Sequence, residues 1–213
     1  MTSRKQAIIV SAVSAVLIAW LLWPSRYERV KNLASPGSNI ISFGDSLTAG
    51  YGASSGEDYP TQLSQRIRVP VINAGVSGDT TESALARIDN AVLAASPRIV
   101  IVGLGGNDYL RGVNIATTEA NLRTIIKKIH DRGAMVVLLG FTFPSLTADY
   151  GSMYERVADD EECLLVEGVM KGILRDRSLK SDEIHPNARG YALMADRIAP
   201  PVAKLIEEAN ETR

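Results

Sequence analysis

Ser46 stands between Asp45 and Leu47, directly after the apolar run Ile40–Phe43. Two interpretations of this serine compete. It can be the polar cap that begins the next segment, or it can be a nucleophile presented at the edge of a sheet. The serine alone does not decide between them, because a nucleophile also needs a general base, a group that orients the base, and donors for an oxyanion.

Only two histidines, His130 and His185, are available as a general base. Asp182 precedes His185 by three residues, so in a turn its carboxylate reaches one imidazole nitrogen and leaves the other free to take a proton from serine. An isolated pair of this kind is more often a turn aspartate beside a surface histidine. His130 follows an amphipathic stretch, and we interpret it as a helix C-terminal cation or a surface residue.

Candidate oxyanion donors follow two further apolar runs. Gly75 lies in INAGVSGDT and Asn107 lies in GLGGNDYLRG. Backbone N–H groups at glycine turns and an asparagine amide are suitable donors for an oxyanion. Each also has a structural explanation, because such turns need a positive φ and Asn107 with Asp108 could cap a helix. The prediction of a site rests on three strand ends that deliver these groups to one edge.

The elements that would position these residues alternate between strand-like and helix-like patterns. We expect Asp79 and Glu82 to form a capping pair for the helix that holds Leu85, and a last helix over about 188–209. The alternation predicts an α/β fold with a parallel sheet covered on both faces. Its ligand site should lie beyond the carboxyl ends of the strands. The predicted strands cover 40–43, 69–73, 99–104, 135–140 and 164–166.

Composition limits the classes of partner and cofactor. The 213 residues carry a formal net charge of −1 and no basic cluster, so we expect no nucleic-acid partner. Cys163 is the only cysteine, which excludes an internal disulfide and leaves the redox compartment open. No Cys/His cluster has the spacing of metal ligands, so we predict neither a metal nor a cofactor.

Residues 7–23 form an uncharged apolar run after Arg4 and Lys5. A cleaved signal peptide and an uncleaved anchor are both compatible with its length. The run ends in Trp-Leu-Leu-Trp-Pro, which is a poor cleavage site, and its two tryptophans suit a membrane interface. We therefore expect one N-terminal transmembrane helix within residues 1–24 as a membrane anchor or signal-anchor, a tether over 25–38 and a catalytic domain over 39–213.

The expected localisation is a single pass through the inner membrane, with the catalytic domain periplasmic or extracellular. Arg26, Arg29 and Lys31 follow the apolar run and weaken the charge bias that would set its orientation. Secretion after signal cleavage is the alternative.

Four short blocks of this chain resemble those of the SGNH (GDSL) hydrolases in order and approximate spacing. They are GDSL at Gly44–Leu47, Gly75, GGND at Gly105–Asp108 and DEIH at Asp182–His185. Over about residues 40–198 the chain is similar to the bacterial thioesterase/lysophospholipase/arylesterase branch of that family. The resemblance implies a flavodoxin-like three-layer αβα sandwich.

The same resemblance implies a role for each candidate residue. It makes Ser46 the nucleophile and His185 the base, with Asp182 orienting His185. It also implies an oxyanion hole formed by the N–H groups of Ser46 and Gly75 and by the Asn107 side chain. The implied enzyme is a carboxylic ester hydrolase that cleaves esters or thioesters of the lysophospholipid, acyl-thioester or aryl ester type through an acyl-enzyme.

Substrate choice is less constrained by the sequence. The stretch that follows the fourth predicted strand either lines an acyl pocket or packs onto the core, and its candidate pocket residues are Phe141, Phe143, Leu146 and Tyr150. We expect a small ester or lipid as substrate and, through residues 7–23, contact with a membrane, whereas protein partners are left open. A carbohydrate O-deacetylase with the same triad and a non-catalytic membrane-anchored accessory protein are the two alternatives.

Overall fold

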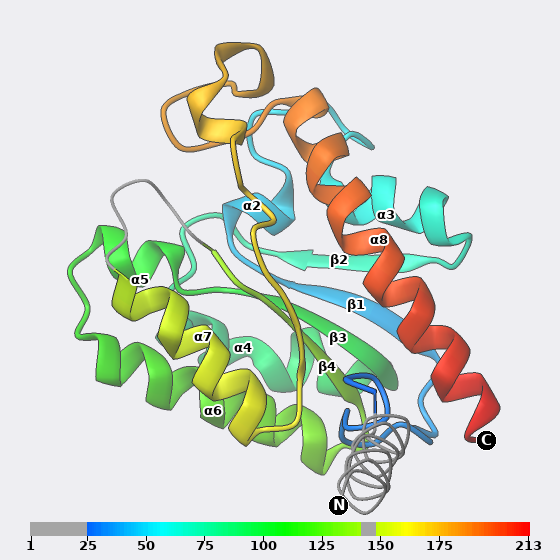
Figure 1. Ribbon diagram of the computed structural model, residues 1–213. Helices are drawn as coiled ribbons and strands as arrows, with labels where there is room; N and C mark the ends of the chain where they lie inside the picture. The colour runs from blue at the N-terminus through cyan, green and yellow to red at the C-terminus, as the bar shows by residue number, and fades with distance from the viewer. Residues whose placement is uncertain (1–24, 142–147) are drawn as a thin grey trace, which may run out of the picture.

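The computed structural model describes residues 25–141 and 148–213. Its strands form one parallel sheet in the order β2-β1-β3-β4-β5, which is the doubly wound order of flavodoxin-like folds (Figure 1). Strand β1 lies between β2 and β3, so the strand order reverses there and a ligand site is expected at its carboxyl end. The strands are β1 (Asn39–Gly44), β2 (Val71–Gly75), β3 (Pro97–Gly103), β4 (Met135–Leu139) and β5 (Leu164–Val166).

Helices cover both faces of this sheet (Figure 1). Helices α3 (Tyr59–Ile67) and α8 (Ala188–Glu211) contact each other on one face. Helices α4 (Thr81–Ala91), α6 (Ile115–Asp131) and α7 (Ala148–Asp160) cover the other. Every residue of β4 is buried, as expected for a strand between two helical layers. The predicted α/β fold with a parallel sheet between helices is therefore confirmed.

Short helices connect these elements at both ends of the sheet. Two of them, α2 and α5, follow β1 and β3 directly and carry the candidate residues of the site. The short elements are α2 (Ser46–Ala49), α5 (Gly106–Leu110) and the 3-10 turns η1 (Leu93–Ala95), η2 (Ile173–Arg175) and η3 (Arg177–Leu179).

The start of α4 differs from the predicted capping pair. Thr80 is the N-cap, since its hydroxyl accepts from the Ser83 N–H while the Ser83 hydroxyl accepts from the Thr80 N–H. Asp79 therefore lies one residue outside the helix, and the prediction that it pairs with Glu82 is wrong. Its carboxylate instead accepts from the Ser83 hydroxyl at 2.9 Å, which leaves its other oxygen for a second partner.

The segment predicted as a tether is bound to the domain. Val30 and Ser35 are buried, and the Asn32 side-chain amide donates to the carbonyls of His130 and Ala134 at 2.9 and 3.0 Å. Because Ala134 immediately precedes β4 and the segment itself leads into β1, it lies at the amino ends of the strands, opposite the end where Ser46 is found (Figure 1). The predicted membrane helix at 7–23 lies outside the described residues, and no helix within the described part is long and apolar enough to cross a membrane.

The prediction that His130 is a helix C-terminal cation or a surface residue is wrong. Its exposed fraction is only 5%, and neither ring nitrogen has a hydrogen-bond partner among the described residues. Burial, together with the positive charge of Lys31, lowers the pKa of His130 to about 4. His130 follows Leu122 and Ile126 at spacings of eight and four residues, so it continues the apolar stripe of α6 that faces the sheet.

This buried imidazole predicts a loss of stability in acid. The pKa of His130 is about 4 in the folded chain and 6.5 ordinarily, so between these values the unfolded chain binds the proton more strongly. Stability should therefore fall as the pH drops from about 6.5 toward about 4. We expect His130→Leu to remove this part of the pH dependence, measured as urea midpoints across that range. Parallel curves for the two proteins would contradict it, because their carboxylates titrate alike.

Candidate active site

Ser46 lies at the carboxyl end of β1, as the first residue of α2. Asp45 caps this helix, with its Oδ1 accepting from the Leu47 N–H at 3.0 Å. The preceding Gly44 is in register with the last residues of both neighbouring strands, Gly75 and Gly103. A Cβ on Gly44 would lie 2.5 Å from the Gly103 carbonyl oxygen, so glycine lets the end of β1 lie close against β3 just before Ser46.

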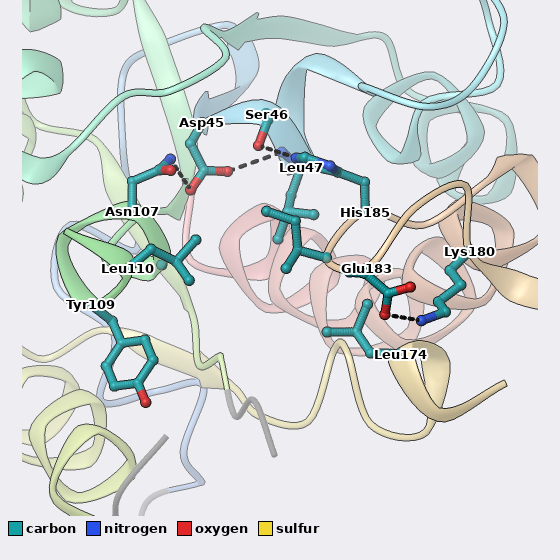
Figure 2. Close-up of a pocket in the computed structure, with 12 residues that line it drawn as sticks. Asp45, Ser46, Leu47, Asn107, Tyr109, Leu110, Leu174, Lys180, Glu183 and His185 are labelled. Carbon is teal, nitrogen blue, oxygen red and sulfur yellow. Dashed lines mark hydrogen bonds and ion pairs between the residues drawn. The ribbon is translucent and has the colours of Figure 1, made fainter. Parts of the chain in front are cut away.

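A hydrogen-bonded chain runs from Ser46 to Asp182 through His185. The Ser46 Oγ is 3.0 Å from His185 Nε2, and His185 Nδ1 is 2.8 Å from Asp182 Oδ2. Figure 2 shows the imidazole of His185 directed at the Ser46 hydroxyl. The structure thus brings together the three residues that the sequence proposed as nucleophile, base and orienting acid, at distances suited to proton transfer.

Asp182 also fixes the backbone that carries His185. Its Oδ1 accepts from the N–H groups of Ile184 and His185 at 2.9 and 2.8 Å. Partial burial works against the charged form of this carboxyl, but the hydrogen bonds from the His185 ring and from these two N–H groups prevail and lower the pKa of Asp182. An ionised Asp182 keeps the proton on His185 Nδ1 and leaves Nε2 as the acceptor.

Two residues that the sequence did not single out support His185. The ring of Tyr51 lies against the imidazole, with 4.5 Å between centroids. Gly52 has φ of 89°, and a Cβ there would lie 2.0 Å from the Ser181 Oγ. Glycine at this position therefore lets the turn after α2 approach the loop that carries His185.

Asn107 projects from α5 toward the Ser46 side of the cleft (Figure 2). Its Nδ2 donates to the Asp79 carbonyl at 3.0 Å and to Asp45 Oδ2 at 3.4 Å. The second contact is long for a hydrogen bond, so the proton involved is the one that a substrate oxygen can take over. The next residue, Asp108, is buried and accepts from the Thr81 N–H at 2.9 Å, which ties α5 to the start of α4.

Gly75 does not present its N–H to this cleft. The N–H donates to Asn73 Oδ1 at 3.0 Å, and a Cβ on Gly75 would lie 2.2 Å from the Ala49 nitrogen. The predicted oxyanion role of Gly75 is therefore not met by this arrangement, and the glycine instead allows α2 to lie close over β2. Within the described residues the N–H groups of Ser46 and Gly78 donate to no acceptor.

Gly78 is thus a second candidate donor, which the sequence analysis did not single out. It has φ of 85° and directly precedes Asp79, whose carbonyl holds the Asn107 amide. The Ser-Gly-Asp turn ahead of α4 was the available signal. Because the direction of an N–H in such a turn depends on the backbone conformation of the glycine, the sequence did not distinguish Gly78 from Gly75.

Asp45 is an acid held in an unusual environment beside the nucleophile. Only 3% of the residue is exposed. Burial and the nearby carboxylates of Asp79 and Asp108 raise the pKa of Asp45 to about 7, against the opposing effect of the Leu47 N–H. The charge next to Ser46 and Asn107 therefore changes near neutral pH.

An open cleft of about 230 Å³ leads away from Ser46 and His185. Its walls are mostly apolar, and the ammonium of Lys180 pairs with Glu183 at 2.9 Å along one side (Figure 2). Apolar surface beside a few polar groups is typical of a small-molecule site. The apolar lining residues are Leu47, Tyr109, Leu110, Leu174 and Ile184.

The predicted pocket residues lie elsewhere or outside the described chain. Phe141 is buried in the core with its ring edge-on to Tyr154, and it does not line the cleft at Ser46. Tyr150 is also buried and packs edge-on against Tyr109, so it supports the wall of the cleft from behind. Phe143 and Leu146 lie outside the described residues.

No group of three or more potential metal ligands occurs among the residues that the structure describes. The hydrogen-bonded chain, the asparagine amide and the apolar cleft instead form a site suited to nucleophilic attack on a carbonyl carbon.

Comparisons with known proteins agree with this geometry. The sequence profile of the GDSL-like Lipase/Acylhydrolase family matches residues 42–193. Thioesterase 1/protease 1/lysophospholipase L1 of Escherichia coli (strain K12) is 32% identical over 184 residues, which cover 81% of this chain and 87% of that protein.

Two solved structures extend the comparison. The psychrotrophic esterase EstA from Pseudoalteromonas sp., inhibited by monoethylphosphonate, superposes with a TM-score of 0.72 at 28% identity, over 79% of this chain and 98% of that one. AlinE4, an SGNH-hydrolase family esterase, gives a TM-score of 0.62 at 36% identity, over 80% of this chain and 98% of that one.

Proposed function

Because this chain belongs to the GDSL-like Lipase/Acylhydrolase family and is a carboxylic ester hydrolase, we propose that it cleaves esters or thioesters of apolar acyl groups through an acyl-enzyme on Ser46. The observation that carries the proposal is the hydrogen-bonded chain from Ser46 through His185 to Asp182 at the end of an apolar cleft.

Acylation begins when Ser46 Oγ attacks the substrate carbonyl carbon. As the new C–O bond forms, the hydroxyl proton passes to His185 Nε2 and the carbonyl electron pair moves onto oxygen. The resulting oxyanion is stabilised by the Asn107 amide and the Ser46 N–H, with the Gly78 N–H as the third donor. Asp182 stabilises the imidazolium that forms.

Collapse of this intermediate breaks the bond to the leaving group, which takes the proton from His185 Nε2. Water then attacks the acyl-enzyme while His185 accepts a proton from it, and the second collapse releases the carboxylic acid and returns the proton to Ser46. The same groups therefore serve both halves of the reaction.

We predict that Ser46→Ala and His185→Ala each lower kcat for an aryl ester by several orders of magnitude while the fold persists. Ser46→Ala should also abolish covalent labelling by a fluorophosphonate, which reacts with an activated serine. His130→Leu is the matched histidine control, and its rate should stay within a few-fold of the wild type. Near wild-type turnover by either triad variant would exclude this mechanism, and absence of labelling in the wild type would favour the accessory-protein alternative.

The lining of the cleft supports an apolar acyl group over an acetyl group on a sugar. Leu110 and Ile184 contribute exposed apolar surface near the nucleophile, which an acyl chain would cover and an acetyl group would leave in water. The cleft is smaller than the roughly 300–1,000 Å³ of typical sites for drug-sized ligands, so we propose chains of moderate length. These chains are shared by the ester, thioester and lysophospholipid classes.

We expect kcat/KM to rise from acetate through butyrate to octanoate in a series of esters with one leaving group, because each added methylene buries apolar surface. Leu110→Ser should lower kcat/KM for octanoate several-fold and leave acetate nearly unchanged. A preference for acetate, together with activity on acetylated oligosaccharides, would instead support the carbohydrate O-deacetylase.

Localisation follows from residues 7–23, which we propose as a membrane anchor with the catalytic domain exported. Seventeen residues at ~1.5 Å each extend roughly 26 Å, slightly less than the ~30 Å hydrocarbon core. The full-length protein should stay with membranes in alkaline carbonate and keep its N-terminal residues. A soluble mature protein that begins after Trp23 would identify a cleaved signal instead.

A further inference from the structure

Arg87 of α4 is a partly buried cation whose contacts lie behind the candidate site. Its Nε is 2.6 Å from Asp79 Oδ2, and its Nη2 donates to the carbonyls of Gly44 and Ala74 at 3.1 and 3.0 Å. The guanidinium also lies over the ring of Phe43, 4.5 Å from its centroid. A planar guanidinium makes these contacts from two nitrogens held in one plane, a geometry that an ammonium with its single nitrogen does not reproduce.

These contacts reach both sides of the reaction centre. Gly44 is two residues before Ser46, so its carbonyl belongs to the strand end that fixes the nucleophile. Asp79 is the residue whose backbone carbonyl accepts the Asn107 amide at 3.0 Å. A single side chain therefore joins the end of β1 to the turn that orients Asn107.

The charges around this turn give Arg87 a second effect. Asp45 adjoins Ser46, and the carboxyl groups of Asp79 and Asp108 lie near enough to act on Asp45 electrostatically. Within the described residues, only Asp79 of these three has an ion-pair partner, and that partner is Arg87. Loss of Arg87 would leave an uncompensated carboxylate, which disfavours a nearby oxyanion.

We propose that Arg87 is a positioning residue for ester hydrolysis, which holds Asn107 and the end of β1 in the geometry that stabilises the oxyanion. The inference rests on the proposed function of Ser46 and Asn107. Arg87 acts through Asn107 and does not touch the substrate. Its loss should therefore lower kcat and leave KM nearly unchanged, because the lost interaction belongs to the transition state.

The test replaces Arg87 with lysine and with glutamine. Either variant loses the simultaneous contacts to Asp79 and the two carbonyls, and we expect kcat to fall about 10- to 100-fold, as for a misplacement of catalytic groups. KM should stay within about twofold. A kcat for Arg87→Lys within about twofold of the wild type would overturn the proposal.

Arg66 provides a matched control on the other face of the sheet. Its Nε is also 2.6 Å from a carboxylate, that of Asp196, and its other nitrogens donate to the carbonyls of Gln62 and Ala192. The two arginines have similar exposed fractions, 27% and 23%. Arg66 joins α3 to α8 and lines no part of the cleft, so Arg66→Lys should leave kcat unchanged. An equal fall in kcat for Arg66→Lys and Arg87→Lys would show a general loss of fold stability and would overturn the proposal.

A double-mutant cycle separates positioning from general support of the fold. Asn107→Ala alone should lower kcat on the order of 10²–10³, as for loss of one oxyanion donor. In that background Arg87→Lys should lower kcat clearly less than it does alone, because the part of its effect that passes through Asn107 is absent. Fully additive losses would show that Arg87 does not act through Asn107.

Asp79→Asn keeps the proposal testable if the Arg87 variants fail to fold. It preserves the backbone carbonyl that holds Asn107 and removes both the ion pair and the carboxylate charge. The charge effect is then absent, and a fall in kcat with KM retained reports the loss of positioning alone. Wild-type kcat in this variant would overturn the proposal. Fluorophosphonate labelling of the wild type keeps the two hypotheses apart, since an unlabelled wild type refutes the proposed function and a labelled, active Arg87→Lys refutes only the inference.

Discussion

The hydrogen bond between Ser46 and His185 joins residues 139 apart in sequence, so it exists only if both ends are held independently. At one end, Ser46 is held by β1, which lies between β2 and β3, and by Asp45, which caps α2. At the other end, Asn187 caps α8 through the N–H groups of Arg189 and Gly190, and its amide binds carbonyls of the loop before His185. The long helix α8, packed on the sheet, thereby sets the position of the base.

Parallel strands concentrate function at one edge because each of them delivers its following turn to the same side. Ser46 follows β1, Asn107 follows β3, and the turn with Gly78 and Asp79 follows β2. The turns contact one another through short hydrogen bonds, such as that between the Asn107 amide and the Asp79 carbonyl. The buried apolar strands form a rigid scaffold. The polar turns would have no fixed conformation alone, and their attachment to this scaffold holds them in place.

Much of this arrangement was predictable from the sequence for identifiable reasons. The strands are continuous apolar runs, and a chain with two histidines offers few choices for a base. The predictions for His130 and Gly75 were wrong because tertiary surroundings determine the charge of a histidine and the direction of a backbone N–H. Burial turned His130 into a neutral core residue, and backbone conformation directed the Gly75 N–H at Asn73.

The cleft beside Ser46 could not be predicted because its walls come from distant, irregular segments. Leu174 and Ile184 belong to a stretch of short turns without helical or strand periodicity, and Tyr109 and Leu110 come from α5. Such residues become neighbours only through the tertiary fold. Arg87 escaped notice for a related reason, since on sequence alone an arginine in an amphipathic helix is indistinguishable from a solvated one.

Residues 30–38 dock at the amino ends of the strands, and this placement has a consequence for the proposed anchor at residues 7–23. A bilayer joined to the chain through residues 7–23 would lie beneath that end, only a few residues of chain from Val30. The cleft opens at the opposite end of β1, whose six residues alone extend roughly 20 Å. With such an anchor, the cleft would open on the side of the domain away from the bilayer, and substrates would reach it from the aqueous compartment.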